Sequence, residues 1–106
     1  MSVSNRSTRI LVVEDSDVQA LALCRVLESG GFLASRAASA EEALEHLARE
    51  TPDLVIADIH LPGMDGRELT RQLRLNEDTR AIPVLMMTSP GVADGERSGI
   101  ESGADA

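Results

Sequence analysis

The chain has no lysine, no tryptophan and no tyrosine, and it contains one phenylalanine, Phe32, and one cysteine, Cys24. A single cysteine excludes a disulfide framework, as is typical of proteins kept in a reducing compartment. No apolar run is long enough to span a bilayer, and residues 1–8 are polar and lack the apolar stretch of a signal peptide. We therefore expect a cytoplasmic protein that has no membrane partner.

The charge of the chain is strongly one-sided. Ten basic residues, all arginine, stand against 18 acidic residues, so the formal net charge is −8 at pH 7, and the sequence contains no basic cluster. Nucleic-acid phosphates are bound through clustered Lys and Arg. The composition therefore argues against direct nucleic-acid binding, while 42% apolar residues in a chain of 106 supply the core of one small domain.

Short apolar runs alternate with amphipathic segments along the chain. Residues 1–8 are predicted to form a disordered arm, and residues 9–106 a single domain. The predicted strands span 9–13, 32–37, 53–57 and 82–87, and the predicted helices span 16–30, 39 to just before Pro52, 66–75 and 92–103. This alternation predicts an α/β fold, a doubly wound parallel sheet with right-handed crossovers.

Three of the predicted helices begin with a side chain that can accept a hydrogen bond from the first turn. Ser16 and Ser39 each stand three residues before Gln or Glu, which is the capping-box pattern, and Asp65 precedes the third helix. The first helix carries apolar residues most of the way round, so we expect neighbouring elements to cover it well.

Polar side chains follow three of the predicted strands. Glu14 and Asp15 come directly after the first strand, Asp58 after the third and Thr88 after the fourth. Ligands of open α/β sheets bind outside the carboxyl ends of the strands, at a topological switch point. These side chains meet only if the first, third and fourth strands are neighbours, which predicts the flavodoxin-like strand order 2-1-3-4.

Three carboxylates brought together repel one another and need a cation. Oxygen ligands without cysteine or clustered histidine suit Mg²⁺ (or Mn²⁺) rather than zinc. A carboxylate nucleophile at Asp58, a metal and the hydroxyl of Thr88 together suit phosphoryl transfer. A phosphatase of the haloacid-dehalogenase type would need aspartate in place of His60, and a flavin-binding flavodoxin would need a phosphate-binding loop after the first strand, so both rivals fit less well.

Four segments in order resemble the receiver domain of a two-component response regulator. They are residues 10–15 (ILVVED), 53–66 (DLVIADIHLPGMDG), 82–89 (IPVLMMTS) and 103–106 (GADA). The resemblance implies that Asp58 is the phosphoacceptor, which takes a phosphoryl group from a sensor histidine kinase or a phosphotransfer protein. It also implies that Glu14, Asp15, Asp58 and the backbone carbonyl of His60 bind Mg²⁺, and that Thr88 is the switch hydroxyl.

Receiver domains of this family continue beyond such a GADA segment into a fifth strand, a lysine and a fifth helix, and the sequence ends at Ala106, before these parts. We therefore expect a sheet without the fifth strand and helix, and a first helix that exposes part of its apolar surface because it lacks this neighbour. The strand at residues 82–87 would then have an exposed edge that favours self-association, for example as a homodimer. The alternative to a phosphoacceptor is a phosphorylation-independent receiver that acts as a protein-interaction module.

Overall fold

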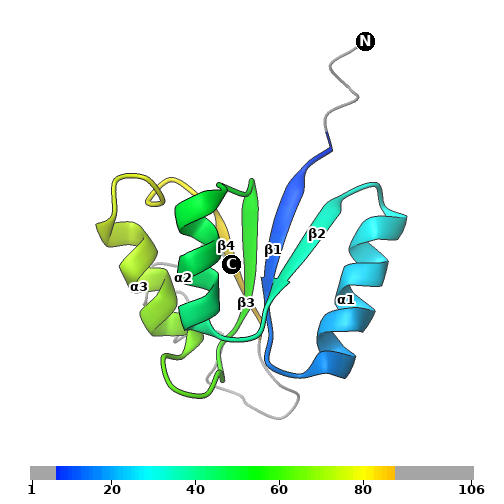
Figure 1. The fold of residues 1–106 in the computed structure, drawn as a ribbon, viewed down its shortest axis with the longest axis horizontal. Coiled ribbons are helices and arrows are strands. Elements are labelled where there is room, and N and C mark those ends of the chain that lie inside the picture. The colour runs from blue at the N-terminus through cyan, green and yellow to red at the C-terminus, as the bar shows by residue number, and fades with distance from the viewer. Residues whose placement is uncertain (1–6, 88–106) are drawn as a thin grey trace.

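Four parallel strands form the centre of the part of the chain that the structure describes (Figure 1). The computed structural model describes residues 7–87, so most of the predicted arm at 1–8 and all of the predicted helix at 92–103 lie outside them. The strands are β1 (Arg9–Val13), β2 (Leu33–Ala37), β3 (Leu54–Asp58) and β4 (Val84–Met87). They are hydrogen-bonded in the order β2-β1-β3-β4, which confirms the predicted strand order.

Within the described residues, three helices cover the sheet from its two sides. Helix α1 (Asp17–Ser29) lies on one face, and α2 (Ala40–Arg49) and α3 (Gly66–Leu75) lie on the other (Figure 1). Each begins as predicted, because Ser16, Ser39 and Asp65 accept the backbone N–H of the residue three positions later, at 3.3, 3.1 and 2.9 Å. Local sequence thus determines where the described helices start.

The strands bury side chains on both faces, as expected for a parallel sheet. Along β1, alternate residues belong to two separate clusters of buried side chains. Leu11 and Val13 belong to the cluster under α2 and α3, whereas Ile10 and Val12 belong to the smaller one under α1. The continuous apolar run that predicted β1 is therefore divided between two cores.

No helix within residues 7–87 is long and apolar enough to cross a membrane.

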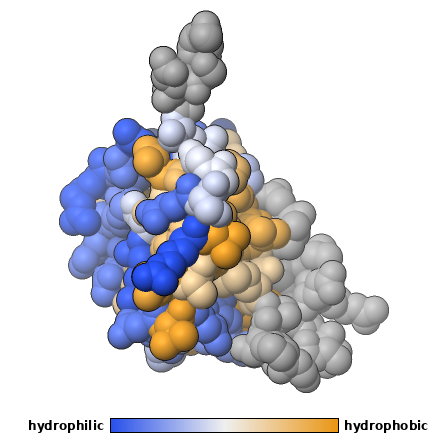
Figure 2. Space-filling view, turned by 90° about the vertical axis from the view of Figure 1, so that its right-hand side faces the viewer, coloured by the Kyte–Doolittle hydropathy of each residue, from blue (hydrophilic) through white to orange (hydrophobic). Residues whose placement is uncertain are grey.

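Helix α1 is only partly covered, so the prediction that neighbouring elements cover it well is wrong, whereas the expectation that part of its apolar surface is exposed is confirmed. Within it Ala20 is buried, but the side chains of Val18, Leu21 and Val26 are 78%, 54% and 65% exposed. The helix packs against the sheet along one side only, through Leu23, Cys24 and Leu27. Figure 2, which faces the α1 side, shows apolar side chains at the surface there. Apolar residues all round a helix show which side chains are suited to burial, but they do not show whether neighbouring helices or strands are present to cover them.

The fourth strand begins at Val84, two residues later than predicted. Pro83 has no N–H to donate to a neighbouring strand, and the N–H of Ile82 donates to the carbonyl of Thr79 at 3.0 Å in the preceding turn. Among residues 7–87, β4 pairs with β3 on one side and has no strand on the other.

Candidate functional site

Three carboxylates meet at the carboxyl ends of β1 and β3. Val13 and Ala57 are direct partners in the pairing of the two strands, so the residues that follow them lie side by side. Glu14, Asp15 and Asp58, here called the acidic cluster, can each present an oxygen atom such that all of these atoms lie within 4.8 Å of one another. The convergence predicted from the sequence is therefore present.

Two members of the acidic cluster are buried. Glu14 is 2% exposed and Asp58 is 7% exposed, whereas Asp15 faces the solvent. Burial raises the pKa of Glu14, and the negative charge of Asp58 raises it further, although a hydrogen bond from the N–H of Ser16 acts in the opposite direction. The folded environment thus favours the protonated form of Glu14 over its charged form.

The donor set of the acidic cluster fits a hard divalent cation. It consists of carboxylate oxygens alone, with no thiolate and no imidazole, which are the ligands that zinc prefers. Mg²⁺ is bound in proteins by one or two carboxylates and keeps several water molecules. A buried pair of acids with one exposed acid beside it is suited to such partial coordination.

The backbone of the following turn orients Asp58. Its Oδ1 accepts the N–H of His60 at 2.9 Å, while the N–H of Ile59 donates to the carbonyl of Met87 at 3.0 Å, extending the pairing with β4. One carboxylate oxygen is therefore fixed by the chain itself. The side chain of His60 is exposed, as expected for a loop residue. Thr88 lies outside the described residues.

Gly66 has a role at the site that the sequence analysis missed. It is the first residue of α3 and is buried, and its N–H donates to the carbonyl of Ile59 at 3.0 Å. A Cβ at this position would collide with the carbonyl oxygen of Asp58. Glycine is a poor helix former, so its position directly after the Asp65 cap is the signal that could have revealed this close approach.

Arg36 on β2 also contacts the site, and the sequence analysis did not single it out. Its guanidinium donates two hydrogen bonds to the main-chain carbonyl of Glu14, from Nε at 3.0 Å and from Nη2 at 2.9 Å. The only available signal was the arginine itself, a charged residue within the predicted strand at 32–37.

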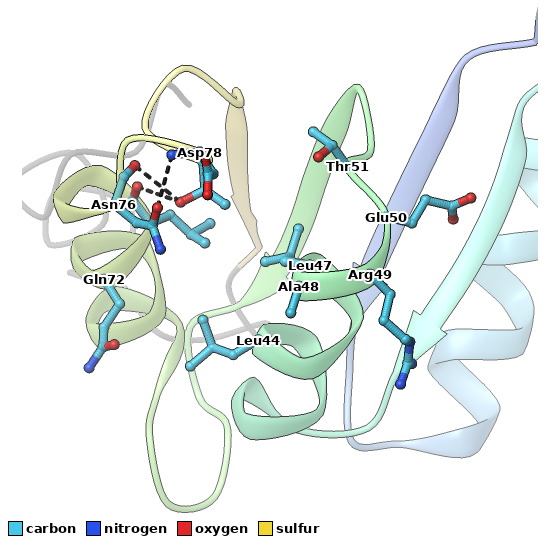
Figure 3. Close-up of a pocket in the computed structure, with 11 residues that line it drawn as sticks. Leu44, Leu47, Ala48, Arg49, Glu50, Thr51, Gln72, Asn76 and Asp78 are labelled. Carbon is cyan, nitrogen blue, oxygen red and sulfur yellow. Dashed lines mark hydrogen bonds between the residues drawn. The ribbon is translucent and has the colours of Figure 1, made fainter.

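A hollow of about 480 Å³ lies away from the acidic cluster, between the carboxyl ends of α2 and α3 (Figure 3). Two of its polar side chains serve the turn after α3: the Asn76 side chain accepts the N–H of Asp78, and the Thr79 hydroxyl donates to the Leu73 carbonyl. None of these groups forms a constellation suited to catalysis. We therefore place the candidate site at the acidic cluster and not in this hollow.

Comparisons with known proteins match this site and fold. The family model of the response regulator receiver domain matches residues 10–106. The phosphate regulon transcriptional regulatory protein PhoB of Escherichia coli (strain K12) is 39% identical over 97 residues, which cover 92% of this chain and 42% of PhoB. The chain thus spans about two fifths of the length of this relative.

Two solved receiver domains of histidine kinases have closely similar structures. The one from Syntrophus aciditrophicus has a TM-score of 0.85 and 37% identity, and the match covers 93% of this chain and 75% of that chain. The receiver domain of the sensor histidine kinase PA1611 from Pseudomonas aeruginosa PAO1, solved with a magnesium ion coordinated in its active-site cleft, has a TM-score of 0.85 and 26% identity, with coverages of 94% and 82%. Family model, relatives and fold agree, and the chain belongs to the response regulator receiver domain family.

Proposed function

We propose that Asp58 accepts a phosphoryl group from a phosphohistidine of a sensor histidine kinase or a phosphotransfer protein. The observation that carries this proposal is the convergence of Glu14, Asp15 and Asp58 within 4.8 Å, with Asp58 almost fully buried at the end of β3. A desolvated carboxylate held among other acids is costly for stability, and such an arrangement is typical of sites that bind a cation and do chemistry.

The proposed step needs one free oxygen on Asp58. Its Oδ1 is held by the N–H of His60, so Oδ2 is the oxygen assigned as nucleophile. In the transfer, Oδ2 forms a bond to phosphorus while the bond between phosphorus and the donor imidazole nitrogen breaks, and the imidazole leaves with the electron pair of that bond. The chain thereby catalyses its own phosphorylation, and attack of water on the acyl phosphate would reverse the modification.

Mg²⁺ is the cofactor in this proposal, held by Glu14, Asp15, Asp58 and the carbonyl of His60. When bound, the ion supplies positive charge that offsets the carboxylates and the phosphoryl oxygens. The magnesium ion in the PA1611 receiver domain supports this choice of metal. The hydroxyl of Thr88 is assigned to hold the phosphoryl group, and a cytoplasmic location is part of the same proposal.

The test is phosphorylation of the chain by a small phosphodonor, such as acetyl phosphate, in the presence of Mg²⁺. We expect the intact mass to increase by one phosphoryl group, the adduct to be cleaved by hydroxylamine as an acyl phosphate is, and Asp58→Asn to abolish it. Asp53→Asn is the matched control, because Asp53 is exposed, five residues earlier in the chain, and its carboxylate accepts the N–H of Arg9. An adduct that survives in Asp58→Asn would refute the assignment.

No modification of the unaltered chain would instead favour the phosphorylation-independent interaction module, which no observation on residues 7–87 supports.

We also propose self-association through the edge of β4 that no strand within residues 7–87 covers. Leu85 on this strand is 38% exposed. Exposed apolar edge strands pair readily with other strands.

A further inference from the structure

Arg36 joins both ends of the turn that carries the exposed acid of the site. Its Nε and Nη2 donate to the carbonyl of Glu14, and its Nη1 donates to the carboxylate of Asp17 at 2.7 Å. Glu14 immediately precedes Asp15, and Asp17 follows it by two residues as the first residue of α1. One guanidinium on β2 therefore spans the segment in which Asp15 lies.

This contact acts where regular strand pairing has ended. The last partners in the β1–β2 pairing are Val13 and Ala37, and one more backbone bond follows, from the N–H of Glu14 to the carbonyl of Ala37 at 3.0 Å. Beyond it, the link from β2 to the turn is made by the side chain of Arg36. The planar guanidinium fixes the direction of the Glu14 carbonyl better than a single donor could.

The charge of Arg36 is not directed at the acidic cluster. Its hydrogen bonds go to a main-chain carbonyl and to Asp17, and none goes to the carboxylate of Glu14, Asp15 or Asp58. An arginine that only neutralised the site would donate to these carboxylates and compete with a cation. The observed geometry instead orders the main chain and leaves the carboxylates to another ligand.

We propose that Arg36 is a positioning residue that holds the Glu14–Asp15 main chain in the arrangement that binds Mg²⁺. The inference rests on the proposed function, since it assigns Arg36 a part in the same site. Replacing a group that hydrogen-bonds to a metal ligand, without touching the metal itself, commonly weakens metal binding by about 10-fold or more. Lysine at this position would keep the charge but lose the two-pronged contact with the carbonyl.

The experiment measures the dissociation constant for Mg²⁺ alone by calorimetry and by NMR, because the chain has no tryptophan or tyrosine to report by fluorescence. We expect Arg36→Met and Arg36→Lys each to raise the constant by about 10-fold. In the metal-free variants, hydrogen exchange at the amides of Asp15 and Ser16 should also speed up. Arg36→Lys decides the outcome if Arg36→Met does not fold.

Arg9→Met is the matched control. Arg9 lies at the opposite end of β1 and pairs with the Glu50 carboxylate, so its loss removes an arginine ion pair without touching the turn. We expect its Mg²⁺ affinity to equal that of the unaltered chain. An unchanged affinity in Arg36→Lys, or a tighter one in Arg36→Met, would overturn the positioning role. If the proposed metal site itself is wrong, the result is different: either the unaltered chain does not bind Mg²⁺, or Asp58→Asn leaves its Mg²⁺ affinity unchanged.

Discussion

Replacing Glu14 by glutamine should stabilise the metal-free protein at neutral pH. The carboxylate is 2% exposed and lies in the acidic cluster beside the carboxylate of Asp58, so both burial and a neighbouring acid disfavour its charged form in the folded state. Glutamine keeps the size of the side chain and an oxygen that can accept the N–H of Ser16, which the glutamate accepts at 3.0 Å. The substitution therefore removes charge while keeping the packing and the hydrogen bond.

The distance between the oxygens sets the size of the effect. Two unit charges at the 4.8 Å limit repel by roughly 3.5 kcal/mol at an effective dielectric constant of about 20, and by roughly 1 kcal/mol in bulk water. We expect a gain between these values, about 2 kcal/mol in the free energy of unfolding, or about 10 °C in Tm for a domain of this size. Burial of Glu14 adds to the gain in the same direction.

The gain depends on pH in a defined direction. The pKa of Glu14 is raised in the folded state above its ordinary value of 4.5, so the folded protein holds this proton more tightly than the unfolded chain does. Ionisation of Glu14 therefore does not destabilise the folded protein below pH 4.5. The destabilisation by this charge grows as the pH rises toward the folded-state pKa of Glu14 and is complete above that pKa. The advantage of Glu14→Gln should be present at pH 7 and vanish in acid.

Thermal unfolding followed by far-UV circular dichroism in a chelating buffer is the assay, with Glu45→Gln on the exposed surface of α2 as the control. Free Mg²⁺ at ten times its dissociation constant should stabilise the unaltered chain by about 1.4 kcal/mol, and Glu14→Gln by less. A variant that is no more stable than the parent at pH 7 would refute the reasoning. A gain that persists at pH 3 would do so as well.

Two further predictions concern packing and assembly. Gly66→Ala should lower the free energy of unfolding by about 1–3 kcal/mol, because the new Cβ collides with the carbonyl of Asp58. The control is Gly30→Ala, which should cost much less because its Cβ would meet the Phe32 ring at an ordinary contact distance of 3.4 Å. Urea unfolding of both variants measures the difference. If β4 mediates self-association, Leu85→Lys should lower the sedimentation coefficient at high concentration and Leu75→Lys, at an 80% exposed position of α3, should not. A single monomeric species for the unaltered chain would contradict the second prediction.

The sequence predicted those features that depend on neighbouring residues or on one strong chemical requirement. Ser16, Ser39 and Asp65 identified the helix starts because a cap acts within one turn. The strand order followed from the requirement that Glu14 and Asp58 meet, since only adjacent strands bring two strand ends together.

Contacts between distant segments could not be predicted in this way. Arg36 and the Glu14 carbonyl are 22 residues apart, and nothing in the local pattern of β2 indicates where that side chain points. The close approach of Gly66 to Asp58 depends on the path of the whole intervening loop. The exposure of Val18 on α1 likewise depends on which elements are beside it, which a helical pattern does not specify.

The arrangement of charge around the acidic cluster argues for function over stability. A guanidinium placed between the carboxylates of Glu14 and Asp58 would offset their repulsion. The guanidinium of Arg36 instead donates hydrogen bonds to the main-chain carbonyl of Glu14 and to the carboxylate of Asp17. The exposed ion pair with Asp17 contributes little to stability, because solvent screens it. A fold selected for stability alone would have paired or removed the buried acids. Within residues 7–87 no cationic side chain forms an ion pair with Glu14 or Asp58, and an external cation that completes the site would explain why these acids are kept.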